Sequence, residues 1–439
     1  MNNNWIVLKF GGSSVAESKH WNTIAQQIQR CLDEHQQPFI VLSALKNVSN
    51  LLEALLHQAL SGVHQSAIDH IKEHHLRLAN QLGLDATDKI NSIIHQLLKY
   101  SDEINLTQTI TPESHAKVLA IGEILSTTIG CEYLKKSGFN VYWQDAREIL
   151  ISNNAQDDWH HFTSNQCDYS QDGNLADSLS EKADVIVTQG FIAADESGKT
   201  VLLGREGSDT SAAYFAAKLN ACKLEIWTDV SGIYSSNPGE INNTQTIPQL
   251  SYQQAQQMAK FGAKVLHPGA VKPALESNIP IEIKNTRLPA DRGSKISAVS
   301  ESERKVLAVV YESKVTQVIA NSDSNEDVLF KLGESGFEVL LTEMVDNQTH
   351  IIAIYKNSDM PQLDDDLLEK KIDGKVVSNL ALVTVVGNDI QENFQNYQRY
   401  FDEKKNRISL LCKAEDCLAI VQSIHDKLID TQCRNQGML

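Results

Sequence analysis

Two segments carry residues that could bind an anionic group. The first is Lys9-Phe10-Gly11-Gly12-Ser13-Ser14, in which a lysine and two glycines follow an apolar run. Glycines let the backbone come close to a bound group, backbone amides can then face an anion, and the lysine adds a positive charge. The spacing is not that of a Walker A loop, and a strand–helix turn that only needs glycine would look the same. Phosphate binding and a plain turn are therefore both open interpretations.

The second segment is Leu203–Asp209, LGREGSD, which places Arg205 in a glycine-rich loop before a small-residue helix. A guanidinium can bind a carboxylate through two parallel hydrogen bonds, so this arginine is suited to an acidic substrate. Asp209 has a plainer alternative, because aspartate is a common N-cap residue.

Two further segments place polar groups at strand or helix ends. Residues Trp227–Tyr234, WTDVSGIY, run from a strand into a polar turn, and residues Phe261–Pro268, FGAKVLHP, carry Lys264 near a helix end. Lys264 could equally be a solvent-exposed lysine beside a helix C-cap.

The elements that must position these segments alternate along the chain. Apolar runs predict strands at 5–10, 38–44, 184–194, 224–230 and 280–286, and helical spacing predicts helices at 21–32, 115–137 and 251–264. This alternation predicts an α/β fold with a doubly wound, mostly parallel sheet, which binds ligands at the carboxyl ends of its strands. Residues 289–305 are polar without an apolar period and are interpreted as a linker.

The chain beyond this linker has a repeated strand and helix pattern. Residues 306–371 follow the order β-α-β-β-α, and a similar but shorter pattern begins at the apolar run 380–387. Residues 388–405 are interpreted as a helix that leads directly to a strand at 407–413, so the second repeat lacks one strand. We therefore predict a catalytic domain at 1–290 and, at 304–439, two small α+β modules with a shortened second module.

Composition excludes several classes of protein. The 439 residues are 41% hydrophobic, and 39 basic against 56 acidic residues give a formal charge of −17. This hydrophobic content is enough to form a folded core. Nucleic acid and anionic membranes are poor partners, because so acidic a chain would repel them. There is no apolar run of about 18 residues to cross a membrane. Seven scattered cysteines without a Cys-x-x-Cys pair indicate free thiols and a cytoplasmic location.

The four segments occur in an order that resembles the amino acid kinases, and specifically the aspartokinases: KFGGSSV, GREGSD, WTDVSGIY, FGAKVLHP. The C-terminal repeat resembles paired ACT modules, which have a ferredoxin-like α+β fold. The resemblance implies transfer of a phosphoryl group from ATP, with Mg²⁺, to the β-carboxylate of L-aspartate. The product is 4-phospho-L-aspartate, on the way to lysine, threonine and methionine. It also implies a homodimer or higher homo-oligomer, because ACT modules commonly pair their sheets.

The resemblance also implies roles for individual residues. Lys9 would contact the transferring phosphoryl group, and Asp209 would orient Lys9 or help to hold the metal. Arg205 would bind the α-carboxylate of aspartate and Glu123 its ammonium group. The implied substrate-binding residues are Ser43, Ser49, Glu123, Phe191 and Arg205, and the implied nucleotide-binding residues are Gly11, Gly12, Ser13, Thr228, Asp229, Tyr234 and Lys264. No dense carboxylate cage is needed, because Mg²⁺ is often held mainly by phosphates and water.

Two departures from the family keep alternatives open. Gly239 stands where an arginine usually contacts nucleotide phosphates, and Glu206 stands where glycine or asparagine is usual. The alternatives are a kinase for another substrate, such as glutamate, acetylglutamate or carbamate, and a catalytically weak relative with a binding or regulatory role. The pair WTDVSGIY and FGAKVLHP, together with the ACT-like tail, favours an aspartokinase over the first alternative.

The expected effector site also departs from the family. Residues 323–327 place three acidic side chains where an amino-acid effector would put its carboxylate, and Leu340 stands where an aspartate often binds the effector's ammonium group. We therefore expect weak or absent inhibition by lysine or threonine.

Overall fold

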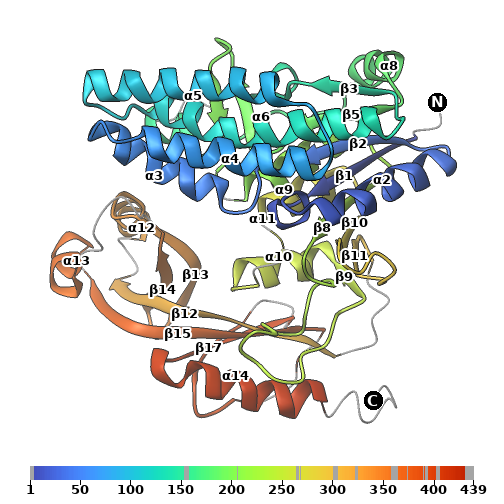
Figure 1. Cartoon of the computed structure of the whole chain (residues 1–439). Coiled ribbons are helices and arrows are strands. Elements are labelled where there is room, and N and C mark those ends of the chain that lie inside the picture. The colour runs from blue at the N-terminus through green and yellow to red at the C-terminus, as the bar shows by residue number, and fades with distance from the viewer. Residues whose placement is uncertain are drawn as a thin grey trace. The chain divides into compact units, whose positions relative to one another are not determined.

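The computed structural model describes residues 4–152, 158–204, 206–263, 266, 268–299, 305–321, 325–356, 364–372, 374–388, 390, 394–401 and 406–430. The chain forms two compact units (Figure 1). Unit 1 comprises residues 1–233, 248–252 and 266–300, and unit 2 comprises residues 234–247, 253–265 and 301–439. These units are defined by contacts within the structure, whereas the domains predicted at 1–290 and 304–439 are defined by function. The functional domains therefore stay a prediction.

Unit 1 is built on an eight-stranded sheet in the order β3-β5-β2-β1-β8-β10-β11-β9. All neighbouring strands are parallel except β10 and β11, so the predicted mostly parallel α/β fold is confirmed. Every residue of β1 is buried, as expected for a central strand with both faces covered. The strands are β1 Trp5–Phe10, β2 Gln37–Leu42, β3 Val141–Gln144, β5 Val185–Gln189, β8 Lys223–Thr228, β9 Gln249–Ser251, β10 Ile281–Asn285 and β11 Ser294–Ser297.

Helices cover this sheet, and α3, α4, α5 and α6 pack against one another (Figure 1). Helix α6 begins with a capping box between Thr111 and Ser114 and ends before Gly138, whose φ of +93° suits glycine. Helix α9 is buried along its whole length and packs on β1 and β2. The helices of unit 1 are α1 Gly12–Val15, α2 Ser18–Asp33, α3 Val48–Leu60, α4 Gln65–Gln81, α5 Thr87–Thr107, α6 Pro112–Lys136, α7 Asp158–Thr163, α8 Gly173–Lys182, α9 Gly207–Lys218 and α11 Pro268–Glu276. Helix α10, Tyr252–Lys260, belongs to unit 2 except for its first residue.

The single strand predicted at 184–194 is wrong, because the chain turns at Gly190 and Phe191. A Cβ on Gly190 would lie 2.7 Å from the Cβ of Ser208, and Phe191 has a φ of +67°. Strand β5 ends before this turn. Strand β6, Ile192–Asp195, belongs to a separate three-stranded sheet with β4, Ile151–Ser152, and β7, Thr200–Leu202. One continuous apolar run in the sequence thus forms strands of two different sheets.

The linker predicted at 289–305 is also partly wrong, since it contains β11. This strand pairs antiparallel with β10 and parallel with β9. Ser294 and Ile296 are buried while Lys295 between them is exposed. Four residues with one buried apolar side chain are too few for a strand period to be visible in the sequence.

Unit 2 contains a six-stranded sheet in the order β13-β14-β12-β15-β17-β16, with all neighbours antiparallel. It has the α+β architecture expected of ACT-like modules. The strands are β12 Val306–Asn321, β13 Phe337–Val345, β14 Gln348–Tyr355, β15 Lys375–Gly387, β16 Gln398–Phe401 and β17 Arg407–Lys413. The helices are α12 Asn325–Glu334, α13 Asp365–Ile372 and α14 Cys417–His425.

The two modules of this sheet share its two long central strands. One core is formed by the later part of β12 with α12, β13, β14, α13 and the start of β15, around residues such as Val318 and Leu332. The other core is formed by the start of β12 with the later part of β15, β17 and α14, around residues such as Val309 and Val421. The second module thus uses the start of β12, the strand whose later part belongs to the first module.

The helix predicted at 388–405 is wrong in the part that the structure describes. Residues 394–397 form a turn, and β16 follows and pairs antiparallel with β17. Tyr400 is fully buried, and its hydroxyl accepts a hydrogen bond of 3.0 Å from Gln317 Nε2. The strand that the sequence interpretation found missing is therefore present.

We expect Tyr400→Ala to destabilise the β15–β17 region by about 3–5 kcal/mol, because it removes a large buried side chain. Amide hydrogen exchange of peptides covering 380–387 and 407–413 measures this locally. Arg399→Ala is the matched control, because Arg399 is exposed on the same strand, and its effect should stay within about 0.5 kcal/mol. Equal exchange in both variants would contradict the buried position of Tyr400.

Candidate functional site

A buried ion pair joins the end of the central strand to the start of the buried helix. Lys9 is the penultimate residue of β1, and its Nζ lies 2.6 Å from Oδ1 of Asp209 in the first turn of α9. Their exposed fractions are 8% and 7%. The N-cap of α9 is Glu206, so the interpretation of Asp209 as an N-cap is wrong. The arrangement fixes a cation at the carboxyl end of a parallel sheet, where an anionic ligand can reach it.

The glycines after Lys9 permit a close contact between two loops. A Cβ on Gly12 would lie 2.8 Å from the carbonyl oxygen of Ala44, and the Gly12 carbonyl accepts a hydrogen bond of 3.1 Å from Lys46 N. The Gly11 amide donates to the carbonyl of Trp227 at 3.0 Å, so it is occupied in tying β1 to β8. Gly12 and Ser13 begin α1, where backbone amides have no acceptor within the helix. Their amides, rather than that of Gly11, are therefore suited to face a phosphate.

Glu123 supplies a buried carboxylate beside the same loop. Its exposed fraction is 3%, and Oε1 accepts a hydrogen bond of 3.1 Å from the backbone amide of Ala44. Oε2 is buried and has no hydrogen-bond donor among the described residues. Burial raises the pKa of Glu123 to about 8. A carboxylate oxygen that is buried without a donor is suited to a ligand that brings a donor or a positive charge.

Ser43 and Phe191 lie at the ends of neighbouring strands. Ser43 follows β2, donates its amide to the Phe10 carbonyl at 3.1 Å and accepts from Ser126 Oγ at 2.6 Å. The Phe191 amide donates to Ser211 Oγ of α9 at 3.2 Å. Both residues therefore lie at the strand-end edge that carries Lys9. Ser49 is exposed in the first turn of α3.

Thr228 ends β8 on the other side of β1, and Asp229 follows directly after it. The Thr228 carbonyl accepts from the amide of Thr286 at 2.8 Å, and its hydroxyl donates to Asp229 Oδ1 at 3.3 Å. Gly232 has a φ of +132°, and a Cβ there would lie 2.5 Å from Ser294 Oγ. The turn after β8 is thus held closely against β11.

Three predicted site residues do not belong to the part of unit 1 described above. Arg205 and Lys264 lie outside the described residues. Tyr234 belongs to unit 2, where it forms an isolated β-bridge with Thr246. Their roles stay predictions.

The sequence interpretation missed two residues that position the glycine segment. Ser14 Oγ donates to the Trp227 carbonyl at 3.2 Å and lies 2.6 Å from Thr286 Oγ1. Both hydroxyls are buried. Ser14 belongs to the first segment, and Thr286 lies at the end of the strand predicted at 280–286. A hydroxyl side chain at the end of a predicted strand is therefore the sequence feature that could have identified both residues.

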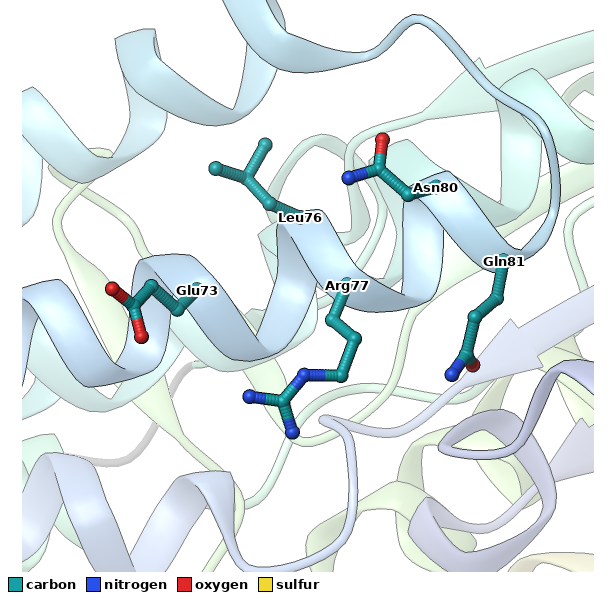
Figure 2. Close-up of a pocket in the computed structure, with 5 residues that line it drawn as sticks. All are labelled: Glu73, Leu76, Arg77, Asn80 and Gln81. Atoms are coloured by element: carbon teal, nitrogen blue, oxygen red, sulfur yellow. The ribbon is translucent and has the colours of Figure 1, made fainter.

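A separate hollow of about 520 Å³ lies on α4 (Figure 2). It is lined by Glu73, Leu76, Arg77, Asn80 and Gln81, with Leu76 and Asn80 turned to one side of the helix and Arg77 and Gln81 to the other. None of these is a predicted site residue, and all come from one helix. The strand-end edge with Lys9, Asp209 and Glu123 is therefore the candidate active site.

Known proteins are similar to this chain in sequence and in structure. The model of the amino acid kinase family matches residues 4–285. The chain is 25% identical to lysine-sensitive aspartokinase 3 of Escherichia coli over 97% of this chain and 99% of that protein. It is 29% identical to the aspartokinase of Chlamydia trachomatis over 76% and 75%. The crystal structure of Escherichia coli aspartokinase III in complex with aspartate and ADP is similar with a TM-score of 0.82 and 25% identity, covering 96% of this chain and 99% of that one.

The raised pKa of Glu123 predicts how stability depends on pH. Between about pH 4.5 and 8 this carboxyl is ionised in the unfolded chain but protonated in the folded one, so its contribution to stability falls as the pH rises. Glu123→Gln cannot titrate. The variant should therefore gain stability relative to wild type with rising pH, by up to about 1.4 kcal/mol per pH unit.

Urea unfolding at pH 5.5 and 7.5, followed by tryptophan fluorescence, measures this difference, because all five tryptophans lie in unit 1. Glu103→Gln removes an exposed carboxylate on α5 and serves as the control. A stability difference between Glu123→Gln and wild type that does not change with pH would show that Glu123 is ionised in the folded protein.

Proposed function

The chain belongs to the amino acid kinase family, and on this premise we propose that it is an aspartate kinase, which transfers a phosphoryl group from ATP to the β-carboxylate of L-aspartate. The observation that carries this proposal is the pair of buried titratable groups, Lys9 and Glu123, at one sheet edge. Lys9 is suited to an anionic phosphoryl group, and Glu123, with its unpaired oxygen, is suited to an ammonium group. The full-length similarity to an aspartokinase bound to aspartate and ADP supports the same substrates.

Different residues bind the two anionic reactants, ATP and aspartate. In the proposed reaction an oxygen of the β-carboxylate attacks the γ-phosphorus of ATP, the bond from that phosphorus to the bridging oxygen breaks, and ADP leaves. Negative charge accumulates on the transferring group, and Lys9, held in place by Asp209, lies where it can offset that charge. Glu123 binds the ammonium group and Arg205 the α-carboxylate, which together set the direction of the β-carboxylate.

The described donors fit ATP with Mg²⁺. The close loop at Gly12 leaves backbone amides beside Lys9 for phosphate oxygens, and Thr228 and Asp229 end the neighbouring strand. Asp209 is the carboxylate nearest to Lys9, and Mg²⁺ commonly takes one or two protein carboxylates plus substrate phosphates. When bound, the ion would offset the charge of the phosphates, with Asp209 as its protein ligand. Tyr234 and Lys264 stay predicted nucleotide-binding residues.

Other features of the proposal concern the whole protein. Antiparallel ACT-like sheets favour pairing between copies of the chain, so we expect a homodimer or higher homo-oligomer. The cytoplasmic location stays a prediction. Among the helices of the described residues, none is both long and apolar enough to cross a membrane.

The positive φ of Glu206, +53°, explains why glycine or asparagine is favoured there. A non-glycine residue in this conformation is strained, and this strain is the observation that favours the alternative of a weakly active relative. An assay with aspartate, glutamate, acetylglutamate and carbamate as acceptors separates these possibilities. Aspartate alone should support turnover.

We expect Lys9→Ala to lower kcat for aspartyl-hydroxamate formation by about 10²–10³, because the lysine charge acts mainly in the transition state. The assay contains ATP and Mg²⁺, and lysine, threonine and methionine are added in parallel runs. Lys19→Ala is the matched control, since Lys19 is an exposed lysine just beyond the same loop. A kcat of Lys9→Ala within a few-fold of wild type would remove Lys9 from the mechanism.

The affinity for aspartate should rise with pH up to about 8. Glu123 must be ionised to bind an ammonium group, and its pKa in the unliganded protein is about 8. The KM for aspartate should therefore fall between pH 6.5 and 8, by up to about tenfold per pH unit. In Glu123→Gln it should be high and independent of pH; a pH-independent KM in wild type would contradict the role of Glu123.

A further inference from the structure

A cavity of about 380 Å³ lies between α5, α6 and β3, outside the candidate active site. Its apolar lining residues include Ile93 of α5, Ile124 of α6 and Trp143 of β3. Ile93 is buried, and Ile124 and Trp143 are half-buried. This volume is within the range of about 300–1,000 Å³ that small-molecule sites occupy, and the lining is mainly apolar, as such sites require.

Charged side chains lie at the rim of this cavity. Lys89 Nζ is 2.7 Å and Lys135 Nζ is 4.0 Å from the same oxygen of Glu132. Two ammonium groups thus share one carboxylate, which leaves a surplus positive charge at the rim of a chain whose net charge is −17. A ligand with an apolar body and one carboxylate complements both parts of the cavity.

A hydrogen-bonded chain connects the cavity to Glu123. Trp143 Nε1 donates to Thr127 Oγ1 at 3.0 Å, and Thr127 Oγ1 donates to the Glu123 carbonyl at 2.8 Å. Gln189 Nε2 donates to the same hydroxyl at 3.2 Å. A hydroxyl has one donor and two acceptor positions, so the bonding capacity of Thr127 is filled. Thr127 is fully buried, and a ligand against Trp143 therefore acts on the turn of α6 that carries Glu123.

We propose that this cavity binds a small amphipathic carboxylate, with an aromatic or branched apolar body, and that its occupation is coupled to Glu123. Binding to this cavity does not depend on the proposed function. An effect of the ligand on the affinity for aspartate does rest on the proposed function. The binding partner is a metabolite-sized monocarboxylate without an ammonium group, distinct from the amino dicarboxylate proposed as substrate at the strand-end edge.

Isothermal titration calorimetry with 3-phenylpropionate tests the binding. We expect saturable binding of one molecule per chain, and at least tenfold weaker binding of the uncharged 3-phenylpropan-1-ol and of acetate, which lacks the apolar body. Ser92→Phe should fill the cavity from its exposed side, and Lys135→Glu should reverse the surplus rim charge; each should weaken binding at least tenfold. Lys99→Glu, an exposed lysine on α5 that does not line the cavity, should bind as wild type does.

Equal binding of the alcohol and the carboxylate would overturn the assigned ligand class. Equal binding by Ser92→Phe and wild type, or no saturable binding at millimolar concentrations, would overturn the site itself. Unchanged thermal unfolding of the variants confirms that they fold.

Amide hydrogen exchange of peptides from residues 119–128 tests the coupling without any substrate. The probe should slow exchange there at least threefold in wild type. Trp143→Phe keeps the aromatic body but lacks the indole donor, so it should bind the probe while losing this effect. Equal slowing in both proteins, or none in wild type, would overturn the coupling.

Calorimetry with L-aspartate alone, and with the probe present, separates this proposal from the proposed function. If aspartate does not bind, the proposed function fails, and the probe's affinity and the exchange data still decide the cavity. If aspartate binds, the probe should change its Kd at least threefold in wild type and less than twofold in Trp143→Phe. An unchanged Kd in wild type would overturn the coupling.

Discussion

A lysine ammonium buried at the end of the central strand is stable only because Asp209 is held against it. Removing an ammonium group from water costs several kcal/mol unless a partner of opposite charge and good geometry compensates. The partner is available because α9 begins beside the end of β1 and packs along β1 and β2 with every residue buried. The small side chains of this helix, such as Ala212 and Ala216, allow that close packing. The charge, the helix and the sheet therefore depend on one another.

The second constraint is the loop after β2, which is held between two groups of the site. The carbonyl of Ala44 approaches Gly12, and its amide donates to Glu123. One short segment thus sets the separation of Lys9 from Glu123, one cationic group and one acidic group. This fixed separation sets how far an ammonium group held by Glu123 lies from an anionic phosphoryl group held by Lys9, because both groups must be bound at once.

Short sequence patterns were enough to predict those parts of the structure that depend on residues close together in the sequence. Lys9 beside two glycines after an apolar strand, and Asp209 at the start of a small-residue helix, are visible as short segments. Their ion pair is a long-range contact, which the resemblance to a family implied as one of two roles for Asp209. The hydrogen bond from Ala44 to Glu123, also long-range, was not predicted. Tyr400 lies in a segment, 388–405, that was interpreted as a helix, whereas a hydrogen bond from Gln317 and burial in the sheet favour a strand. The turn at Gly190 escaped notice because the contact with Ser208 that requires glycine is also distant in sequence.

The long strand β12 has a consequence for the order in which the chain can fold during synthesis. Its first half, around Val309, pairs with the segment around Val385, which leaves the ribosome only after the whole first module has been made. At about 5–20 residues per second the nascent chain waits for several seconds before that pairing is possible. During this interval the apolar residues Val306–Val310 have neither their strand partner nor the cover of α14. An unpaired apolar strand is a template for association with other chains, so newly made protein is at most risk of aggregation before its last helix emerges.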